Sequence, residues 1–328
     1  GQDDPMMHFY ETFLAAYDPQ LREKRGVYYT PMPVVSFIVR SVDHLLKTRF
    51  NLPQGLADTT KLPDGNHKVL VLDPAVGTAT FPYAVIDLIR DDFMQRNDAG
   101  MWSDYVCEHL LDRIFGFEIM IAPYAVAHFK LALQLAGYDL ELPKEQKKLW
   151  SYDFQANDRI GVYLTNTLEV LDDEIEGLFG PTKFVAEEAK AADKVKQEMP
   201  IMVVLGNPPY SISSANNGEH IQNLMDLYKE AVREERNIQP LSDDYIKFIR
   251  FAHDRIEQTG SGIIAMITNN SYISGLIHRG MRKSILDTFD EIYVLNLHGN
   301  AFVRESTPTY EVDQNVFDIR QGVAISFF

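Results

Sequence analysis

The residues Asn207-Pro208-Pro209-Tyr210 carry the most explicit chemistry in this sequence, and they directly follow the apolar run 201–206. That run is short and β-branched, which predicts a buried strand, and a double proline ends a strand abruptly. The amide oxygen of Asn207 and the carbonyl of Pro208 can both accept hydrogen bonds from one –NH2 group, while the Tyr210 ring can stack on its ring system. We therefore interpret the motif as a site for an exocyclic amine on a planar base, at the strand end where α/β sheets bind ligands. The alternative is a turn that only leaves a strand.

A second strand with a turn at its end is predicted further upstream. The apolar run 68–72 predicts a buried strand, and the turn that leaves it contains Asp73, Ala75 and Gly77. Asp73 offers a carboxylate at the strand tip, and the small residues allow a ligand to approach the backbone closely. The turn is neither the phosphate-binding loop, because no Gly-Lys-Ser/Thr follows, nor a full G-x-G-x-x-G motif. A helix over residues 81–94 is expected to follow it.

The next predicted strand, residues 113–118, ends in an acidic residue, Glu118. A carboxylate at the tip of the next strand of a βαβ unit is well placed to bind the two hydroxyls of a ribose. The alternative is an ordinary exposed glutamate at a strand end.

Near the N-terminus, Thr30 followed by Pro31 predicts the start of a helix that runs to about Lys47. In this interpretation the Thr30 hydroxyl is the N-cap and the proline occupies the first turn. The helix N-terminus directs backbone N–H groups at whatever lies beside Tyr29.

The remaining patterns predict an α/β protein with seven strands separated by helices. Residues 172–200 predict a solvent-exposed helical insertion without candidate functional residues, and residues 211–218 predict a polar loop. Further strands are expected at 160–164, 262–268, 291–297 and 323–328, and further helices at 8–24, 122–135, 219–236 and 243–258.

Composition and charge narrow the class of protein. The chain has 328 residues, 45% of them hydrophobic and 24% charged, which is typical of globular proteins. No apolar stretch approaches 18 residues, no secretory signal is recognisable, and Cys107 is the only cysteine, so we expect a cytoplasmic protein without a membrane span. The net charge of −16 argues against a protein that coats nucleic acid non-specifically, but not against an enzyme whose DNA-binding domain lies elsewhere.

Taken in order, Tyr28-Tyr29-Thr30-Pro31, the turn at 73–77, Glu118 and the motif at 207–210 resemble the motifs of amino-group DNA methyltransferases, specifically γ-class N6-adenine enzymes. The segments 8–11 and 26–31 most resemble the methyltransferase portion of Type ISP, single-chain restriction-modification enzymes. This resemblance implies a Rossmann-like S-adenosylmethionine-dependent methyltransferase fold. Its sheet has seven mostly parallel strands with one antiparallel strand, and N-terminal helices are added to it.

The resemblance also implies which residues bind S-adenosylmethionine. Glu118 would hold the ribose and Ile119 would lie against the cofactor's adenine, while Asn166 occupies a position where the family often has an aspartate that binds this adenine. Ala79 replaces the usual third glycine of the loop, which together with Asn166 puts cofactor affinity in question. The residues implied at the methionine end are Tyr29, Thr30, Asp73, Ala75 and Gly77.

The implied reaction is methyl transfer to the N6 amino group of adenine in double-stranded DNA, with the target base flipped out. Asn207 and Pro208 would accept hydrogen bonds from the amine and Tyr210 would stack on the base. The alternatives are an RNA or protein-glutamine amino methyltransferase, and a non-catalytic cofactor- or DNA-binding module of a larger assembly.

For domain organisation we expect an N-terminal helical segment, 1–50, that carries the Tyr-Thr-Pro motif, and a methyltransferase domain, 51–328. Insertions are expected at 172–200 and 211–240. Because the chain ends in an apolar strand, we expect a fragment of a longer protein. The resemblance places a nuclease and a helicase-like motor upstream and a target-recognition domain downstream.

Overall fold

The structure is a computed structural model that describes residues 30–170, 181–210, 214, 216–300, 315–317 and 319–328. Its centre is one seven-stranded sheet with the strand order β3-β2-β1-β4-β5-β7-β6. β7 is antiparallel to both of its neighbours, and the other strand pairs are parallel. The strands are β1 Val71–Asp73, β2 Ile114–Glu118, β3 Gly161–Leu164, β4 Val203–Gly206, β5 Ile263–Asn269, β6 Tyr293–His298 and β7 Val323–Phe327.

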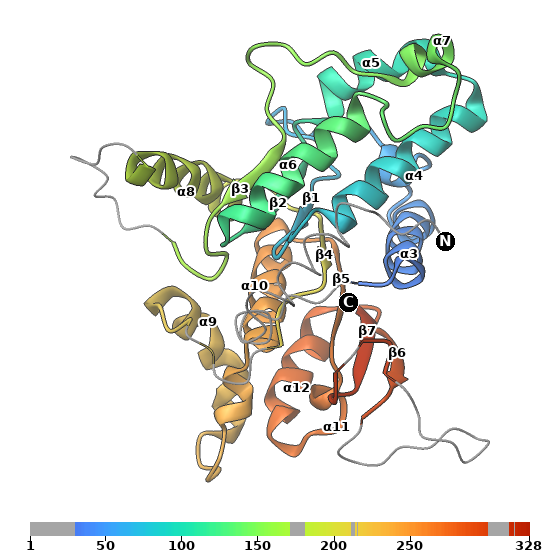
Figure 1. The fold of residues 1–328 in the computed structure, drawn as a ribbon. Coiled ribbons are helices and arrows are strands. Elements are labelled where there is room, and N and C mark those ends of the chain that lie inside the picture. The colour runs from blue at the N-terminus through green and yellow to red at the C-terminus, as the bar shows by residue number, and fades with distance from the viewer. Residues whose placement is uncertain (1–29, 171–180, 211–213, 215, 301–314, 318) are drawn as a thin grey trace.

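Helices cover both faces of this sheet (Figure 1). α3 packs against α4 and β5, α6 packs against β2 and β3, and α10 packs against β5. The helices of eight or more residues are α3 Met32–Arg49, α4 Thr80–Arg96, α6 Ile121–Leu135, α8 Pro181–Gln197, α9 Glu219–Lys229, α10 Asp244–Thr259 and α12 Arg279–Thr288. Single-turn helices are α5 Trp102–Tyr105, α7 Lys144–Lys147 and α11 Ser271–Ser274.

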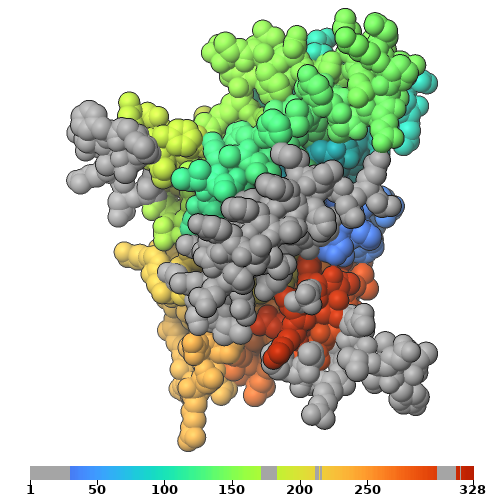
Figure 2. Space-filling view, viewed as in Figure 1, coloured from blue at the N-terminus to red at the C-terminus, as the bar shows by residue number. Residues whose placement is uncertain are grey.

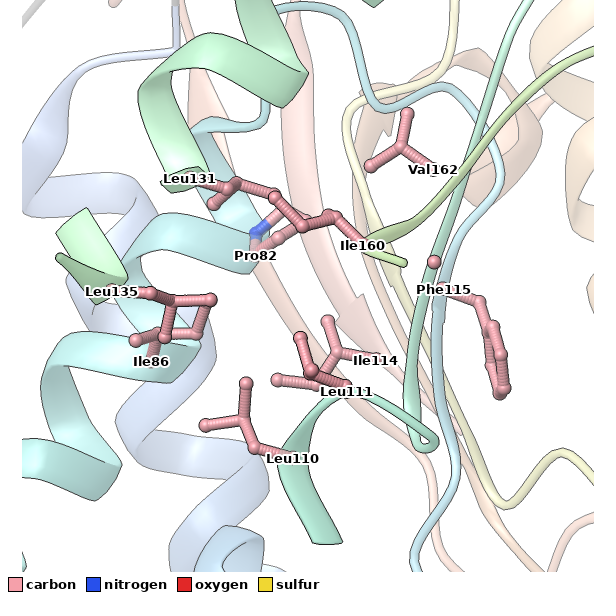
Figure 3. A pocket seen from close by; sticks show the side chains of 11 residues that line it. Pro82, Ile86, Leu110, Leu111, Ile114, Phe115, Leu131, Leu135, Ile160 and Val162 are labelled. Atoms are coloured by element: carbon pink, nitrogen blue, oxygen red, sulfur yellow. The ribbon is translucent and has the colours of Figure 1, made fainter. Parts of the chain in front are cut away.

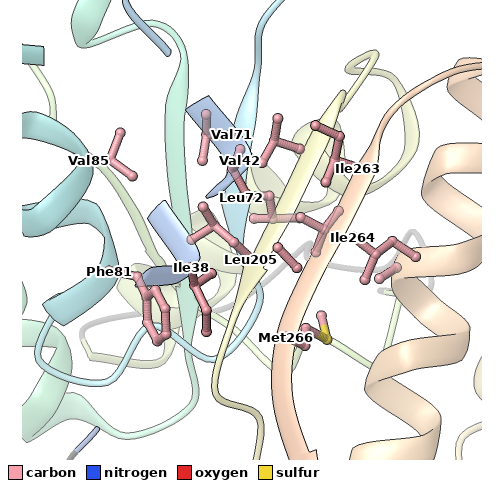
Figure 4. Close-up of a cluster of buried hydrophobic side chains, with 14 of the residues drawn as sticks. Ile38, Val42, Val71, Leu72, Phe81, Val85, Leu205, Ile263, Ile264 and Met266 are labelled. Atoms are coloured by element: carbon pink, nitrogen blue, oxygen red, sulfur yellow. The ribbon is translucent and has the colours of Figure 1, made fainter. Parts of the chain in front are cut away.

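The core lies between α3, α4 and the central strands (Figure 4). Ile38 and Val42 recur at helical spacing on α3 and are fully buried, as is Leu72 on β1. In β5, every residue is buried, as expected for a strand that is covered on both faces. This burial fixes the strand ends relative to one another, which is what a site at the sheet edge requires.

The predicted fold is confirmed, and most predicted elements agree with the observed bounds to within three residues. One prediction about a helix end was wrong: α3 begins at Met32 with Pro31 in the N-cap position, and no side chain caps it. The Thr30 hydroxyl makes a long-range contact instead, described below. The predicted helix at 8–24 lies outside the described residues. α3, the described part of the predicted 1–50 segment, is built into the same hydrophobic core as the sheet.

The prediction of a solvated helix over 172–200 was also wrong in part. α8 lies at the margin of the molecule, as does α9 (Figure 2). Nevertheless, one side of α8 packs against β3, where Glu188, Ala192, Val195 and Lys196 are buried. The four residues recur at helical spacing, so the helix is amphipathic despite its high content of charged residues.

A small apolar cavity of about 10 Å³ lies between α4, α6 and the strands β2 and β3 (Figure 3). Its walls come from Pro82, Ile86, Leu131 and Ile160, among others, and include none of the predicted site residues. A space of this size without polar partners is a packing gap and not a binding site. In the part of the chain that the structure describes, no helix has both the length and the apolar character needed to cross a membrane.

Candidate active site at the carboxyl edge of the sheet

The predicted site residues lie along one edge of the sheet, where the parallel strands end. The strand order reverses between β1 and β4, which are adjacent and parallel, and ligands of open α/β sheets bind at such a switch point. Asp73 ends β1, Glu118 ends β2 and Asn207 directly follows β4. Asn166 follows β3 by two residues and therefore lies at the same edge.

Asn207 is held by the side chains of two residues, the distant Thr30 and the nearby Tyr210. Its Nδ2 donates a hydrogen bond of 2.9 Å to Oγ1 of Thr30, which is buried. Its Oδ1 accepts a hydrogen bond of 2.6 Å from the hydroxyl of Tyr210, which also contacts the carbonyl of Ile267 at 3.3 Å. The Tyr-Thr-Pro motif and the Asn-Pro-Pro-Tyr motif, 177 residues apart, thus meet through one hydrogen bond.

The Tyr210 side chain is buried and does not face an open site. Its ring packs edge-on against Phe317, with the ring centroids 6.4 Å apart. Burial raises the pKa of Tyr210 well above its usual value, so the hydroxyl keeps its proton and acts as a donor to Asn207. Stacking of Tyr210 on a base therefore stays a prediction, and it requires the side chain to rotate out of this position.

Asp73 is a buried carboxyl group at the tip of β1. Its Oδ1 accepts a hydrogen bond of 3.1 Å from the backbone N–H of Ala75. Burial, with a smaller contribution from the nearby charge of Glu118, raises the pKa of Asp73 to about 8. A Cβ atom at Gly206 would lie 2.7 Å from Asp73 Oδ1, so only glycine fits at this end of β4.

Glu118 holds the turn that follows β1. Its two carboxylate oxygens accept hydrogen bonds from the backbone N–H groups of Gly77, at 3.1 Å, and Met120, at 2.8 Å. Gly77 has a positive φ of 54°, and no atom of the described residues lies within 4 Å of the position that a Cβ atom would take. The turn thus presents bare backbone beside a carboxylate, as a close ligand contact requires.

Ala79, which stands where the family pattern has glycine, adopts a backbone conformation that favours glycine. Ala79 adopts the left-handed conformation, with φ 63° and ψ 39°, directly before α4. Glycine adopts this conformation without a Cβ clash, which explains why the family pattern has glycine here. Because Ala79 has a Cβ atom, its left-handed conformation adds backbone strain at this turn. Its side chain is fully buried in the core.

Asn166 is bound from two sides. Its Oδ1 accepts a hydrogen bond from the N–H of Leu168 at 3.2 Å, and its Nδ2 donates to Oδ1 of Asn216 at 2.9 Å. Behind it, the buried ammonium group of Lys196 on α8 donates to the carbonyls of Asn166 and Glu169 at 2.9 and 2.8 Å. α8 therefore supports the turn that leaves β3.

These residues fit S-adenosylmethionine in chemical character. The ligand has a cationic methionine end, which the carboxylate of Glu118 complements; the neighbouring carboxyl group of Asp73, which keeps its proton in the ligand-free protein, would do so on ionising. Open backbone at Gly77 permits close approach, and Ile119, which is 47% exposed, offers an apolar surface for an adenine ring. Tyr29 lies outside the described residues.

The structure brings the predicted residues into two groups, one around Asn207 and one around Asp73 and Glu118. Sequence reasoning missed Gly206, Asn216 and Lys196. The helical spacing of residues 188, 192, 195 and 196 could have indicated the buried face of α8. A single asparagine in a polar loop gives no such signal.

The strand order with β7 reversed, together with acidic residues at the tips of β1 and β2, defines the Rossmann-like fold of S-adenosylmethionine-dependent methyltransferases. Residues 112–302 match the family of Eco57I restriction-modification methylases, and residues 1–166 match the N-6 DNA methylase family. Each match spans at least half of the chain. The chain therefore belongs to the N6-adenine DNA methylases of restriction-modification systems, as the sequence motifs predicted.

Solved structures with the same fold come from longer chains, two of which are Type ISP restriction-modification enzymes. DrdV in complex with DNA is 28% identical, with a TM-score of 0.70 over 98% of this chain and 28% of that chain. The ATP-dependent Type ISP enzyme LlaBIII bound to DNA is 27% identical, with a TM-score of 0.73, and the match covers 98% of this chain and 20% of the LlaBIII chain. A nuclease-deletion mutant of Type ISP LlaGI is 22% identical, with a TM-score of 0.67, and the match covers 98% of this chain and 28% of the LlaGI chain. At this identity the similarity is one of fold. No curated protein sequence matches the chain. The chain thus spans less than a third of these solved relatives.

Proposed function

We propose that the chain transfers the methyl group of S-adenosylmethionine to the N6 amino group of adenine in double-stranded DNA, as the modification part of a larger restriction-modification enzyme. The observation that carries this proposal is the position of Asn207. Its amide lies at the switch point of the sheet, bonded to Thr30, and the strand that bears it is in contact with Asp73 through Gly206. An amide acceptor for an amine thus lies next to carboxyl groups suited to a cationic methyl donor.

The residues have separate tasks in this proposal. Asp73, Ala75 and Gly77 would hold the methionine end, Glu118 the ribose, and Ile119 with Asn166 the adenine of the cofactor. When bound, S-adenosylmethionine supplies an electrophilic methyl group on a sulfonium. The open backbone at Gly77 and the pair of carboxyl groups support this placement.

Asn207 and Pro208 would act on the target base. The lone pair of the adenine amino nitrogen is delocalised into the ring, so this nitrogen is a weak nucleophile. Hydrogen bonds from its two N–H groups to Asn207 Oδ1 and the Pro208 carbonyl favour a more tetrahedral nitrogen, whose electron pair is then directed at the methyl carbon. As the new N–C bond forms, the bond from the methyl carbon to sulfur would break with its electron pair left on sulfur. One of the N–H protons becomes acidic and leaves through its acceptor to water. Positioning therefore supplies most of the catalysis.

The full-length protein would bind DNA through further domains. The solved relatives DrdV, LlaBIII and LlaGI are DNA complexes whose chains extend well beyond the region matched here. A target-recognition domain outside this chain would account for a net charge of −16 in an enzyme that acts on DNA. A nuclease and a helicase-like motor in the same protein are part of the proposal.

The test is methyl transfer by purified full-length protein from isotopically labelled S-adenosylmethionine to unmethylated double-stranded DNA, followed by nucleoside analysis. We expect label in N6-methyldeoxyadenosine. Label in RNA or in a protein glutamine under parallel conditions, with none in DNA, would identify the alternative substrates. Absence of label in every substrate, despite cofactor binding, would indicate a non-catalytic module.

A further inference from the structure

Asn166, at the cofactor edge, is connected to the start of α10 by an uninterrupted chain of side-chain hydrogen bonds. Asn166 Nδ2 donates to Asn216 Oδ1 at 2.9 Å, and Asn216 Nδ2 donates to Asp244 Oδ1 at 3.0 Å. Asn216 belongs to the loop that follows the Asn-Pro-Pro-Tyr motif. The chain of bonds therefore joins the turn after β3, the loop after β4 and the first turn of α10.

The direction of every bond in this chain is fixed by its two ends. At one end, the backbone N–H of Leu168 can only donate, so it selects the oxygen of the Asn166 amide. At the other end, Oδ1 of Asp244 accepts, so it selects the nitrogen of the Asn216 amide. The two asparagine amides between them then have one mutually consistent orientation.

This arrangement explains why an asparagine at position 166 suits this chain. An aspartate, which the family often has here, would place an acceptor opposite Asn216 Oδ1. Asn216 could turn its amide round to donate to it, but its oxygen would then face the carboxylate of Asp244. Because Asp244 is buried, two acceptors in contact there would be unfavourable.

Asn216 is held in place independently of Asn166. The ammonium group of Lys247, on the fully buried side of α10, donates to the carbonyl of Asn216 and to Oγ of Ser214, the latter at 2.7 Å. Asn216 is therefore a fixed point against which the Asn166 amide is oriented.

We propose that Asn216 is a positioning residue for the cofactor: by holding Nδ2 of Asn166, it keeps the Asn166 amide oxygen available as an acceptor for the exocyclic amine of the cofactor's adenine. This inference rests on the proposed use of S-adenosylmethionine and extends it to a residue of the loop that follows the catalytic motif. Since linkage is reciprocal, cofactor binding also strengthens the hold on this loop.

The test measures the Kd of S-adenosylhomocysteine by calorimetry for the full-length protein and its Asn216→Asp variant. The carboxylate introduced at position 216 would face the carboxylate of Asp244, and the repulsion would withdraw it from Asn166. We expect the Kd to rise about tenfold, as for a hydrogen-bonded group that loses its partner. The matched control is Asn217→Asp, the same change in the adjacent exposed residue, which bonds Gln222 instead. Its Kd should stay within about twofold of wild type.

A second variant restores the chain of bonds in the Asn216→Asp background. In Asn216→Asp/Asp244→Asn, the new amide at 244 can donate to the carboxylate at 216, which still accepts from Asn166. We expect the Kd to return to within about threefold of wild type, while Asp244→Asn alone has a small effect because an amide oxygen also accepts.

The melting temperature without ligand separates positioning from a purely structural role. A lower melting temperature with an unchanged Kd in Asn216→Asp, or a double variant that binds as weakly as Asn216→Asp, would overturn the inference. If the wild-type protein bound no S-adenosylhomocysteine, the proposed cofactor itself would be wrong and the inference would fall with it.

Discussion

The hydroxyl of Tyr210 donates a hydrogen bond of 2.6 Å to Oδ1 of Asn207, so the aromatic residue of the motif occupies an acceptor that the proposed mechanism gives to the target amine. The Tyr210 ring is buried against Phe317 at the same time. A base that enters the site would therefore compete with Tyr210 for Asn207. Release of the hydroxyl would free both the acceptor and an aromatic face for stacking.

Tyr210→Phe and Tyr210→Ala separate these two roles. Phe keeps the ring and frees Asn207, so we expect methylation within about threefold of wild type and a free energy of unfolding lowered by about 1 kcal/mol. Ala removes the stacking surface, and methylation should fall by about 10- to 100-fold, because stacking of a base on an aromatic ring contributes about 1–3 kcal/mol. Single-turnover methylation assays and denaturant unfolding measure the two effects. Equal losses for both variants would contradict stacking.

Asp73→Asn should change how stability depends on pH. The pKa of Asp73 is raised to about 8, whereas an unfolded chain has an ordinary carboxyl pKa of about 3.9. Between these values the folded protein keeps a proton that the unfolded chain releases, so wild-type stability falls as pH rises. The variant lacks this dependence, and its melting temperature should exceed that of wild type by about 3 °C or more at pH 8, with a smaller difference at pH 5.

Buried histidines also make stability depend on pH, in the opposite direction, and their contribution cancels when Asp73→Asn is compared with wild type. Desolvation lowers the pKa of His67 to about 4 and of His253 to about 3, so these residues destabilise the folded protein as pH falls below about 6.5. They do so equally in both proteins. A melting-temperature difference that stayed constant from pH 5 to pH 8 would show that Asp73 is not the responsible group.

Gly206→Ala should damage the site through contact with Asp73. The new Cβ atom would lie 2.7 Å from Asp73 Oδ1, and a φ of 155° disfavours alanine as well. We expect a loss of about 1–3 kcal/mol in unfolding free energy, together with weaker S-adenosylhomocysteine binding. Gly65→Ala is the control, because Gly65 also has a positive φ, of 90°, but no atom in the described part of the chain lies within 4 Å of the position that its Cβ would take. A Gly65→Ala variant with the same binding defect would exclude the contact as its cause.

Lys196→Met should loosen the turn after β3. The ammonium group of Lys196 satisfies Thr165 Oγ1 and the carbonyls of Asn166 and Glu169. Without it, buried acceptors lose their partner, so we expect a loss of about 2–3 kcal/mol by denaturant unfolding. Lys194→Met, on the exposed side of the same helix, should stay within about 0.5 kcal/mol of wild type. A neutral Lys196→Met would show that this network does not stabilise the turn.

The sheet could be predicted because its strands are nearly continuous apolar runs that end in turn residues, as at 201–206. Likewise, Asp73, Glu118 and Asn207 could be placed at one edge because parallel strands share a carboxyl end. The motif order supplied the reversed strand, which no single stretch of residues indicates.

The parts that could not be predicted depend on contacts between distant residues. Thr30 has the right type and position for an N-cap, yet its hydroxyl bonds Asn207, 177 residues away. α8 has the composition of a solvated helix, but contact with β3 buries Glu188 and Lys196. The rotamer of Tyr210 is set by Phe317 and Ile267, neither of which is close to it in sequence.

The most direct test of the central claim is long-read detection of N6-methyladenine in DNA from cells that express the full-length protein or its Asn207→Ala variant. Asn207→Ala should leave S-adenosylhomocysteine binding largely intact, since the proposed function gives Asn207 to the target amine and not to the cofactor. We predict a defined sequence motif methylated at adenine with the wild-type protein and unmethylated with the variant. Methylation of the same motif by Asn207→Ala, or unmodified DNA despite well-expressed, folded wild-type protein, would contradict the account.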